Sequence, residues 1–371
     1  MKIAVVITAR PSYSRVKTVL ENLKGACDLQ IVVAASALVE RYGNVAQQIE
    51  DDGFDVAVRV PCLLEDSSLS AMALTTGVAL QGLTRVLEDL RPDKVVTIAD
   101  RYETLATAIA ASYMNIPLVH LQGGESTGSI DDKVRFAVSQ LADFHYCATE
   151  AAERRLAEVG HGSLVRTGCP SIDLARRAMG SPKFEIFEDY GGVGPTWDVE
   201  ARQYAIVLQH PVTNEYADAG KQVRETITAM EQFGMPTFWF WPNPDSVSDA
   251  MSRGLRKWRE CGERFSKIPV HFFRNLSPEH FLNFMFNAAV IVGNSSVAIR
   301  EGSYMGTPAV NIGSRQQGRE RGPNVIDAGY DSEEILKAIG RAVVQQRPMS
   351  SLYGDGKSGE RIAKLILGDT P

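Results

Sequence analysis

The chain has 371 residues, which is long for a single hydrophobic core and suits two domains. Hydrophobic residues make up 44% of it and charged residues 23%, the balance of an ordinary globular protein. The formal net charge of −6 argues against nucleic acid or an anionic membrane as a partner. The sequence opens directly on a strand pattern and has no apolar run of bilayer length, so we expect neither a signal peptide nor a membrane span.

The first half of the chain alternates apolar runs with amphipathic stretches. A strand is predicted from Lys2 to Thr8, followed by a helix that Ser12 or Ser14 caps and that runs to Lys24. Further strands are predicted at 28–35, 55–60, 94–99, 117–121, 144–148 and 164–166, and helices at 38–52, 69–90, 101–114, 131–141, 150–159 and 172–179. Continuously apolar strands separated by helices predict a parallel sheet covered on both faces.

The stretch from Gly168 to Gln203 changes character, because Ser-Pro and Gly-Gly-Val-Gly-Pro interrupt the alternation. The pattern then resumes, with strands at 204–208, 237–241, 270–273, 288–292 and 308–312 and helices at 215–232, 246–259, 278–287, 295–305, 333–344 and 360–367. We expect an α/β fold of two Rossmann-like lobes with parallel sheets, facing each other across a cleft. The predicted parts are a first lobe at 1–168, a crossing at 169–203, a second lobe at 204–345, and a segment at 346–371 whose helix packs back on the first lobe.

One candidate site follows the strand at 288–292, where Asn294 turns the chain and Ser295 or Ser296 caps a helix. Such a helix start points free N–H groups at the carboxyl edge of the sheet, which is a seat for phosphate. Glu301, further along this helix, is an acceptor for sugar hydroxyls. The alternative is a capped helix without a ligand.

A basic loop follows the next strand and carries Arg315, Arg319 and Arg321. We expect it to bring three guanidinium groups toward the phosphate seat. A solvated basic loop is the alternative.

Carboxylates gather after two consecutive strands of the first lobe. Asp100 and Glu125 come just past the strand ends, and Asp131 and Asp132 begin the next helix. Like charges around one site raise one another's pKa, which sets up one group as a base and another as an acid. Alternatives exist: Asp100-Arg-Tyr-Glu103 is also a capping-box pattern, and Asp131 and Asp132 match the dipole of their helix.

Two further residues end strands where ligands bind. His210 follows the strand at 204–208 and could touch a phosphate or protonate a leaving group, with a turn histidine as the alternative. Arg10 ends the first strand and suits a phosphate clamp, whereas His120 is predicted to be a core histidine.

Cofactor and metal signatures are missing from the sequence. There is no Walker motif and no GxGxxG after the first strand, so no dinucleotide cofactor is predicted. The five cysteines are scattered, odd in number and without a CxxC pair, and no His/Asp grouping has close metal spacing. We expect no essential metal, and reduced thiols in the cytoplasm.

In chain order these motifs resemble the UDP-N-acetylglucosamine 2-epimerase family over nearly the whole chain. The matching segments are Asp100-Arg-x-Glu103, Ile116-Pro-x-x-His120, Gly123-Gly-Glu-x-Thr127, Asp131-Asp-x-x-Arg135, Gly168-x-Pro170, His210-Pro-x-Thr213, Asn294-Ser-Ser296 with Glu301, and Gly306-x-Pro308 through Arg315 to Arg319. The resemblance implies a GT-B-like fold and points to the hydrolysing branch, whose members release UDP and N-acetylmannosamine or act on related nucleotide amino sugars.

The resemblance also implies roles for the candidate residues. The acid/base and phosphate-side residues that it suggests as catalytic are Asp100, Glu125, Asp131, Asp132 and His210. The substrate-binding set, with Glu301 on the ribose, is Arg10, Arg135, Asn294, Ser295, Ser296, Glu301, Arg315 and Arg319. Two segments depart from the family pattern, namely Phe136, where a histidine is usual, and the loop at 10–13. Both could line the sugar pocket, so the resemblance does not fix the sugar.

The implied reaction is loss of the nucleoside diphosphate from C1 with the proton from C2, followed by water addition with inversion at C2. The alternatives are a non-hydrolysing epimerase or GT-B glycosyltransferase, and a non-catalytic nucleotide-sugar binder. A nucleotide sugar, UDP-linked or GDP-linked, is the expected partner. A homo-oligomer (dimer or tetramer) is expected as well.

Overall fold

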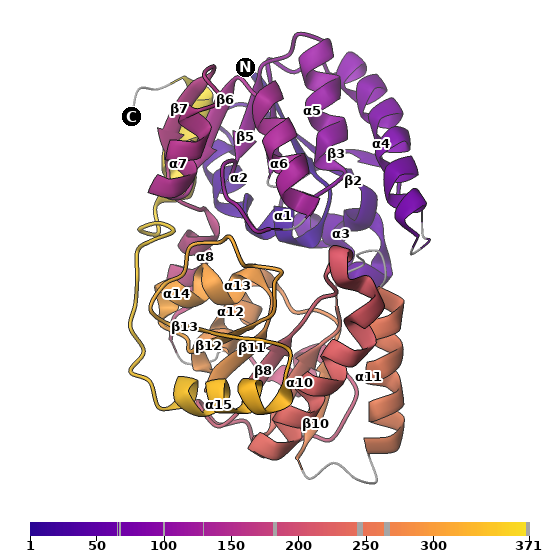
Figure 1. The fold of residues 1–371 in the computed structure, drawn as a ribbon. Helices are drawn as coiled ribbons and strands as arrows, with labels where there is room; N and C mark the ends of the chain where they lie inside the picture. The colour runs from indigo at the N-terminus through magenta and orange to yellow at the C-terminus, as the bar shows by residue number, and fades with distance from the viewer. Residues whose placement is uncertain are drawn as a thin grey trace. The chain divides into compact units, whose positions relative to one another are not determined.

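The structure, a computed structural model, describes residues 1–64, 66, 68–98, 101–128, 130–180, 184–242, 248–262 and 268–368. The chain divides into two compact units, each built on one parallel sheet (Figure 1). The first unit comprises Met1–Ser126, Ile130–Leu174 and Tyr353–Pro371, and the second comprises Thr127–Ser129 and Ala175–Leu352.

The sheet of the first unit has the strand order β3-β2-β1-β4-β5-β6-β7. Its strands are β1 (Lys2–Ile7), β2 (Asp28–Ala34), β3 (Val56–Val60), β4 (Lys94–Ile98), β5 (Leu118–Leu121), β6 (Phe144–Cys147) and β7 (Ser163–Arg166). All neighbouring pairs are parallel. The order reverses between β1 and β4, and ligands bind at such a reversal in open α/β sheets.

Helices cover both faces of this sheet. They are α1 (Arg10–Ser14), α2 (Lys17–Leu23), α3 (Val45–Asp51), α4 (Leu69–Leu90), α5 (Thr104–Tyr113), α6 (Ile130–Leu141), α7 (Glu150–Ala157) and α16 (Ser358–Leu367), with α8 (Ser171–Ala178) at the boundary of the unit and 3-10 turns at Ala35–Leu38 and Glu40–Tyr42. Alternate residues of β1 explain the two layers. Ile3 and Val5 pack in one cluster with α1–α3 and α16, whereas Ala4 and Val6 pack in another with α4–α6.

The C-terminal helix α16 belongs to the first unit, where Figure 1 shows it in yellow among indigo and magenta elements. Its own N-cap, Lys357, makes no capping hydrogen bond. Asp173 of α8 caps it instead, accepting from Ser358 N at 2.9 Å and Gly359 N at 2.6 Å. Thr18 of α2 donates to the same carboxylate at 3.1 Å, so one buried side chain ties three helices together.

The sheet of the second unit has the order β10-β9-β8-β11-β12-β13, again with parallel neighbours. Its strands are β8 (Ala205–Leu208), β9 (Thr237–Phe240), β10 (Val270–Phe273), β11 (Val290–Gly293), β12 (Ala309–Ile312) and β13 (Val325–Ala328). Its helices are α9 (Ile186–Tyr190), α10 (Ala219–Phe233), α11 (Ser248–Gly262), α12 (Pro278–Asn287), α13 (Ser296–Ile299), α14 (Glu301–Met305) and α15 (Ser332–Val343), with a 3-10 segment at Thr213–Asp218.

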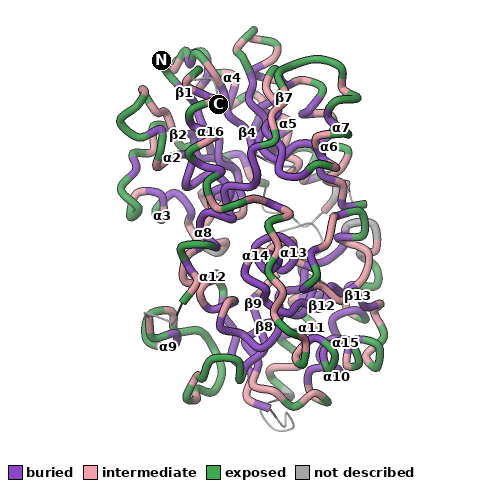
Figure 2. The backbone as a smooth tube through the Cα atoms, turned by 90° about the vertical axis from the view of Figure 1, so that its left-hand side faces the viewer, coloured by how far each residue is buried: buried purple, intermediate pink, exposed green. Residues whose placement is uncertain are grey.

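In the second unit too, successive residues of a strand pack on opposite faces of the sheet. Val207 of β8 and Trp239 of β9 pack with α10, α11 and α15. Phe238 packs among aromatic rings on the opposite face, and it meets Phe284 of α12 edge to face. Figure 2 shows β4 and β8, from the two sheets, in the purple of buried residues. The predicted fold class, α/β with two Rossmann-like parallel sheets, is therefore confirmed.

Several predicted boundaries are wrong. The helix expected from Arg101 begins at Thr104, and its N-cap Glu103 makes no side-chain capping bond. The capping-box alternative for Asp100 lies outside the described residues. The first helix begins at Arg10 without a side-chain cap, because Pro11 already favours the first turn. The helix expected at 38–52 is two 3-10 turns followed by α3.

Other differences lie in the second unit. The helix expected at 295–305 is interrupted at Arg300, whose ψ of −70° ends α13 before α14 begins. The strand β13 and the short helix α9 were not predicted. The edge strand β13 is only partly buried and carries Asp327, so it lacks the continuous apolar run that marked the other strands, and α9 has only five residues for a periodicity argument. The boundary between Leu174 and Ala175 lies inside the predicted crossing.

Two further observations concern the described residues only. None of their helices is both long enough and apolar enough to span a bilayer. Cys27, Cys62, Cys147 and Cys169 are thiols and not halves of a disulfide.

Candidate active site

His210 and Asn294 meet at the point where the strand order of the second sheet reverses. His210 follows β8 and Asn294 follows β11, and these strands are neighbours. Gly293 makes the approach possible, because its φ of +139° suits glycine and a Cβ there would overlap the Leu208 carbonyl oxygen. The Asn294 amide then pairs with the His210 backbone, donating to its carbonyl at 2.8 Å and accepting from its N–H at 2.7 Å. The side-chain oxygen and nitrogen of Asn294 thus both form hydrogen bonds with the His210 backbone.

The basic loop after β12 is anchored at the same place. Arg315 Nη1 and Gln316 Nε2 each donate to the Asn294 carbonyl at 3.1 Å. Arg319 Nε donates to Gln316 Oε1 at 2.8 Å, so Arg319 joins the cluster through Gln316. Arg321 differs from the expectation, because it forms an ion pair with Asp327 of β13 at 2.7 Å. The structure therefore brings two of the three guanidinium groups toward Asn294.

The helix after Asn294 is shorter than predicted. Ser295 is the N-cap of α13 without a capping side-chain bond, and Ser296 Oγ accepts from Arg300 Nη2 at 3.2 Å. A helix of one turn carries little macrodipole, since the dipole grows with aligned peptide units. An anion at this edge would consequently depend on local N–H groups and on the neighbouring guanidinium of Arg315.

Glu301 begins α14 and is 5% exposed. Arg300 Nε lies 3.9 Å from its Oε2, and that oxygen accepts no hydrogen bond from the described residues. Burying a carboxylate oxygen without a donor costs free energy. A hydroxyl group of a ligand is a donor that would offset this cost.

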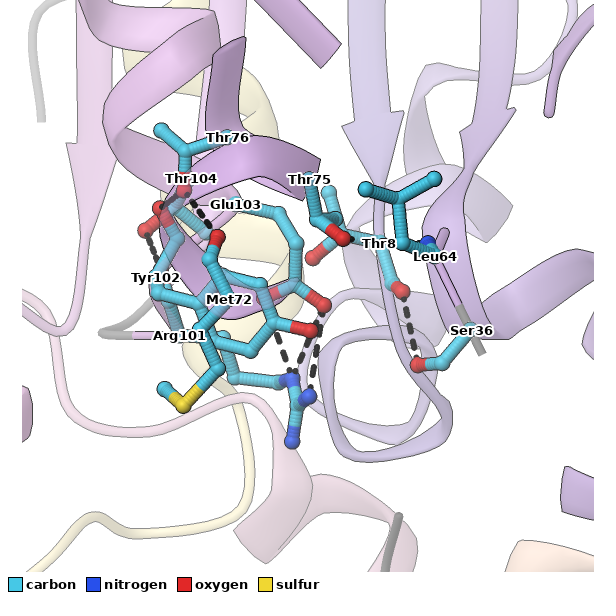
Figure 3. A network of polar contacts seen from close by, with 10 residues as sticks. All are labelled: Thr8, Ser36, Leu64, Met72, Thr75, Thr76, Arg101, Tyr102, Glu103 and Thr104. Atoms are coloured by element: carbon cyan, nitrogen blue, oxygen red, sulfur yellow. Dashed lines mark hydrogen bonds and ion pairs between the residues drawn. The ribbon is translucent and has the colours of Figure 1, made fainter. Parts of the chain in front are cut away.

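In the first unit, Arg10 follows β1 at the corresponding reversal and is half-buried. Burial lowers the pKa of Arg10 to about 10. Asp100, expected after β4, lies outside the described residues. The residues that follow it form a buried ion pair, in which Arg101 Nε lies 3.3 Å from both carboxylate oxygens of the fully buried Glu103 (Figure 3).

The turn after β5 carries Glu125, which is 5% exposed. Gly124 has a φ of +75°, and a Cβ there would overlap the Ala152 carbonyl. His120, at the end of β5, is fully buried with Nδ1 3.2 Å from Ser139 Oγ, so its prediction as a core histidine is confirmed.

Arg135 of α6 fixes this turn. It is 1% exposed, and its Nη1 donates to the Glu125 carbonyl and, at 2.6 Å, to Asp132 Oδ1. Ser126 Oγ donates to the other oxygen of Asp132 at 3.1 Å. Asp131, next to it in the first turn of α6, is half-buried. The geometry thus gives Arg135 and Asp132 a supporting part in the turn that presents Glu125.

Three residues near these clusters were not predicted. Glu103 and Gln316 lie inside motifs that the sequence already singled out, so a check of each motif position for buried partners would have found them. Glu215 lies two residues after the His-Pro-x-Thr motif and had no other signal. Within the described ranges, no group of three or more His, Cys, Asp or Glu side chains could hold a metal ion.

The parallel sheets of both units, with charged residues at the reversal of each strand order, define a GT-B-like α/β protein with paired Rossmann-like units. A family model described as UDP-N-acetylglucosamine 2-epimerase matches residues 21–367. The chain therefore belongs to the UDP-N-acetylglucosamine 2-epimerase family.

Named relatives agree with this assignment. The chain is 33% identical to the UDP-N,N'-diacetylbacillosamine 2-epimerase (hydrolyzing) of Legionella pneumophila, over 98% of this chain and 95% of that protein. It is 27% identical to the GDP/UDP-N,N'-diacetylbacillosamine 2-epimerase (hydrolyzing) of Campylobacter jejuni, over 88% and 84%. The fold matches the crystal structure of the Neisseria meningitidis UDP-GlcNAc 2-epimerase bound to UDP-GlcNAc over the full length of both chains, with a TM-score of 0.81 at 18% identity.

Proposed function

We propose that the protein is a hydrolysing 2-epimerase of a nucleotide-linked 2-acetamido sugar. The observation that carries the proposal is full-length similarity, at 33% identity, to a relative whose name states this activity. The polar residues that follow the strands of both sheets support it. A non-hydrolysing epimerase, a glycosyltransferase and a non-catalytic binder are the alternatives.

The second unit supplies the nucleoside diphosphate contacts in this proposal. Arg315 and His210 face the diphosphate, together with the N–H groups around Ser295 and Ser296. Glu301 accepts from the ribose hydroxyls. Its buried Oε2 accepts no hydrogen bond from the residues that the structure describes, which supports this role. Charge that develops on the departing diphosphate is stabilised by these positioned donors.

The first unit supplies the acid and base. A carboxylate, Asp100 or Glu125, removes the C2 proton while the C1–O bond breaks, and the electron pair leaves with the diphosphate. This elimination yields a 2-acetamidoglycal. Water then adds its oxygen to C1, and C2 receives a proton from the opposite face, which inverts that centre. A second carboxylate, Asp131, positions the water or donates this proton.

The adjacent carboxylates of α6 take different parts in the proposal. Asp132 has one oxygen on Arg135 and the other on Ser126. A carboxylate engaged in this way is suited to support and not to proton transfer. We therefore assign a positioning role to Asp132 and Arg135. For the acid/base role we propose Asp131, which lies in the first turn of the same helix, after the Glu125 turn.

For the sugar, we propose a UDP-linked 2,4-diacetamido sugar ahead of UDP-GlcNAc. Support comes from the two relatives named above, both of which are diacetylbacillosamine enzymes by name. Homo-oligomerisation and a cytoplasmic location are parts of the same proposal. The thiol state of the described cysteines supports a reducing compartment.

The test is to incubate the protein with UDP-N,N'-diacetylbacillosamine, UDP-GlcNAc and their GDP counterparts and to follow free nucleotide and sugar by chromatography. We expect UDP and a sugar with inverted C2, formed fastest from the diacetamido substrate. Epimerised nucleotide sugar without free UDP would favour the non-hydrolysing alternative, and no turnover of any substrate would favour the binder.

A further inference from the structure

Glu215 lies at the centre of a hydrogen-bond cluster in the second unit that no part of the proposed reaction uses. Tyr330 OH donates to Glu215 Oε2 at 2.6 Å, and Gln222 Nε2 donates to the same oxygen at 2.8 Å. Ser314 Oγ donates to Oε1. The donors come from the loop after β12, the segment after β13, and α10. Glu215 itself lies in the segment after β8, so one carboxylate joins three connections at the carboxyl edge of the sheet.

The charge states of the cluster suit this geometry. Burial raises the pKa of Glu215, but the hydrogen bonds from Ser314, Tyr330 and Gln222 outweigh it and hold that pKa below its usual value. Burial and the bond to Glu215 raise the pKa of Tyr330 to about 12, so the phenol keeps its proton. Near neutral pH an ionised acceptor therefore faces neutral donors, which is the stronger kind of hydrogen bond.

The loop that Glu215 holds is the one that carries Arg315. Gly313 packs against the Tyr330 ring, where a Cβ would overlap the ring. Ser314 is fixed to Glu215, and the next residue, Arg315, reaches the Asn294 carbonyl. Two hydrogen bonds thus set the direction of the Arg315 guanidinium, namely that of Ser314 to Glu215 and that of Arg315 itself to the Asn294 carbonyl. A loop that is already ordered loses less entropy when a ligand binds.

We propose that Glu215 is a positioning residue for nucleoside diphosphate binding, which acts by fixing the loop at 313–319 so that Arg315 points at the diphosphate. This inference rests on the proposed function, because it takes a diphosphate as the ligand of Arg315. It assigns Glu215 no contact with the ligand.

The test measures the dissociation constant for UDP by calorimetry on the full chain. Glu215→Gln keeps the shape but removes the charge, and Tyr330→Phe removes one hydroxyl group. We expect UDP to bind about tenfold more weakly to Glu215→Gln, and less weakly than that to Tyr330→Phe. In turnover, KM should rise in both variants while kcat changes little. Glu225→Gln is the matched control. Among the described residues, Glu225 of α10 is seen to accept one hydrogen bond, from Ser332 N at 3.1 Å. The Glu225→Gln variant should bind UDP as the wild type does.

A double variant decides whether Glu215 acts through Arg315. Arg315→Ala should weaken binding strongly, and Glu215→Gln added to it should cost nothing more. An additive loss in the double variant, or wild-type affinity in both Glu215→Gln and Tyr330→Phe, would overturn the inference while leaving the proposed function standing. A wild-type protein that binds no UDP would overturn both.

Discussion

At the scale of single residues, we predict different roles for the neighbouring carboxylates Asp131 and Asp132. Asp131→Asn should lower kcat by about 10²- to 10⁴-fold, because it removes proton transfer and keeps the shape. Asp132→Asn should lower the melting temperature, because the buried Arg135 loses its ion pair with Asp132, and breaking a buried pair costs about 3–5 kcal/mol. Thermal melts and steady-state rates on both variants test this pair. The assignment is wrong if the two variants exchange behaviour.

The sequence predicted the position of residues that directly follow a strand. Arg10, Glu125, His210 and Asn294 each follow an apolar run, and parallel strands deliver such residues to one edge of a sheet. The sequence did not predict which of these residues form hydrogen bonds with each other. Nothing in the sequence pairs the Asn294 amide with the His210 backbone, since that contact needs the strand order, the register and a glycine between them.

At the scale of elements, the attachment of α16 depends on a cap from another helix. Asp173→Ala removes the acceptor for Ser358, Gly359 and Thr18 and should destabilise the first unit by about 2–4 kcal/mol. Asp331→Ala, which removes the local cap of α15, is the matched control and should cost only about 1 kcal/mol. Urea unfolding together with protease cleavage near α16 measures both effects. Equal losses in the two variants, with α16 protected in each, would show that Asp173 is an ordinary cap.

The ends of β8 and β11 approach closely only because of Gly293. Gly293→Ala should lower the melting temperature and remove UDP binding, since the new Cβ collides with the Leu208 carbonyl and displaces Asn294. Gly340→Ala is the control. Gly340 lies on the exposed side of α15 with open space around it, so alanine should stabilise the helix by about 0.5–1 kcal/mol. Wild-type UDP affinity in Gly293→Ala would mean that the strand ends are not held by this contact.

Long elements were predictable from the sequence, whereas a break that depends on one residue was not. The 22-residue α4 has the predicted bounds of Leu69 and Leu90, because six turns give a clear amphipathic pattern. The interruption at Arg300 left no sign in the periodicity, since four residues on one side and five on the other still follow the helical spacing. This is the reason why the predicted phosphate-binding helix is one turn long.

At the scale of the whole molecule, the repeated strand–helix alternation predicted two parallel sheets, and the ordered motifs predicted the family. Both are confirmed. The sugar depends on finer contacts than a motif describes. Phe136, the departure noted from the family pattern, is 39% exposed on α6, so its side chain is accessible to a ligand or to solvent.

The central claim is elimination followed by hydration, and a single reaction in deuterated water tests it most directly. The protein is incubated with UDP-N,N'-diacetylbacillosamine, or with the best substrate of the panel, and the product is analysed by proton NMR. The mechanism predicts equal amounts of free UDP and of a sugar with inverted C2 that carries one deuterium there, because the abstracted proton exchanges with solvent before water adds. A product that keeps its C2 proton, or free UDP with an uninverted sugar, would contradict the mechanism.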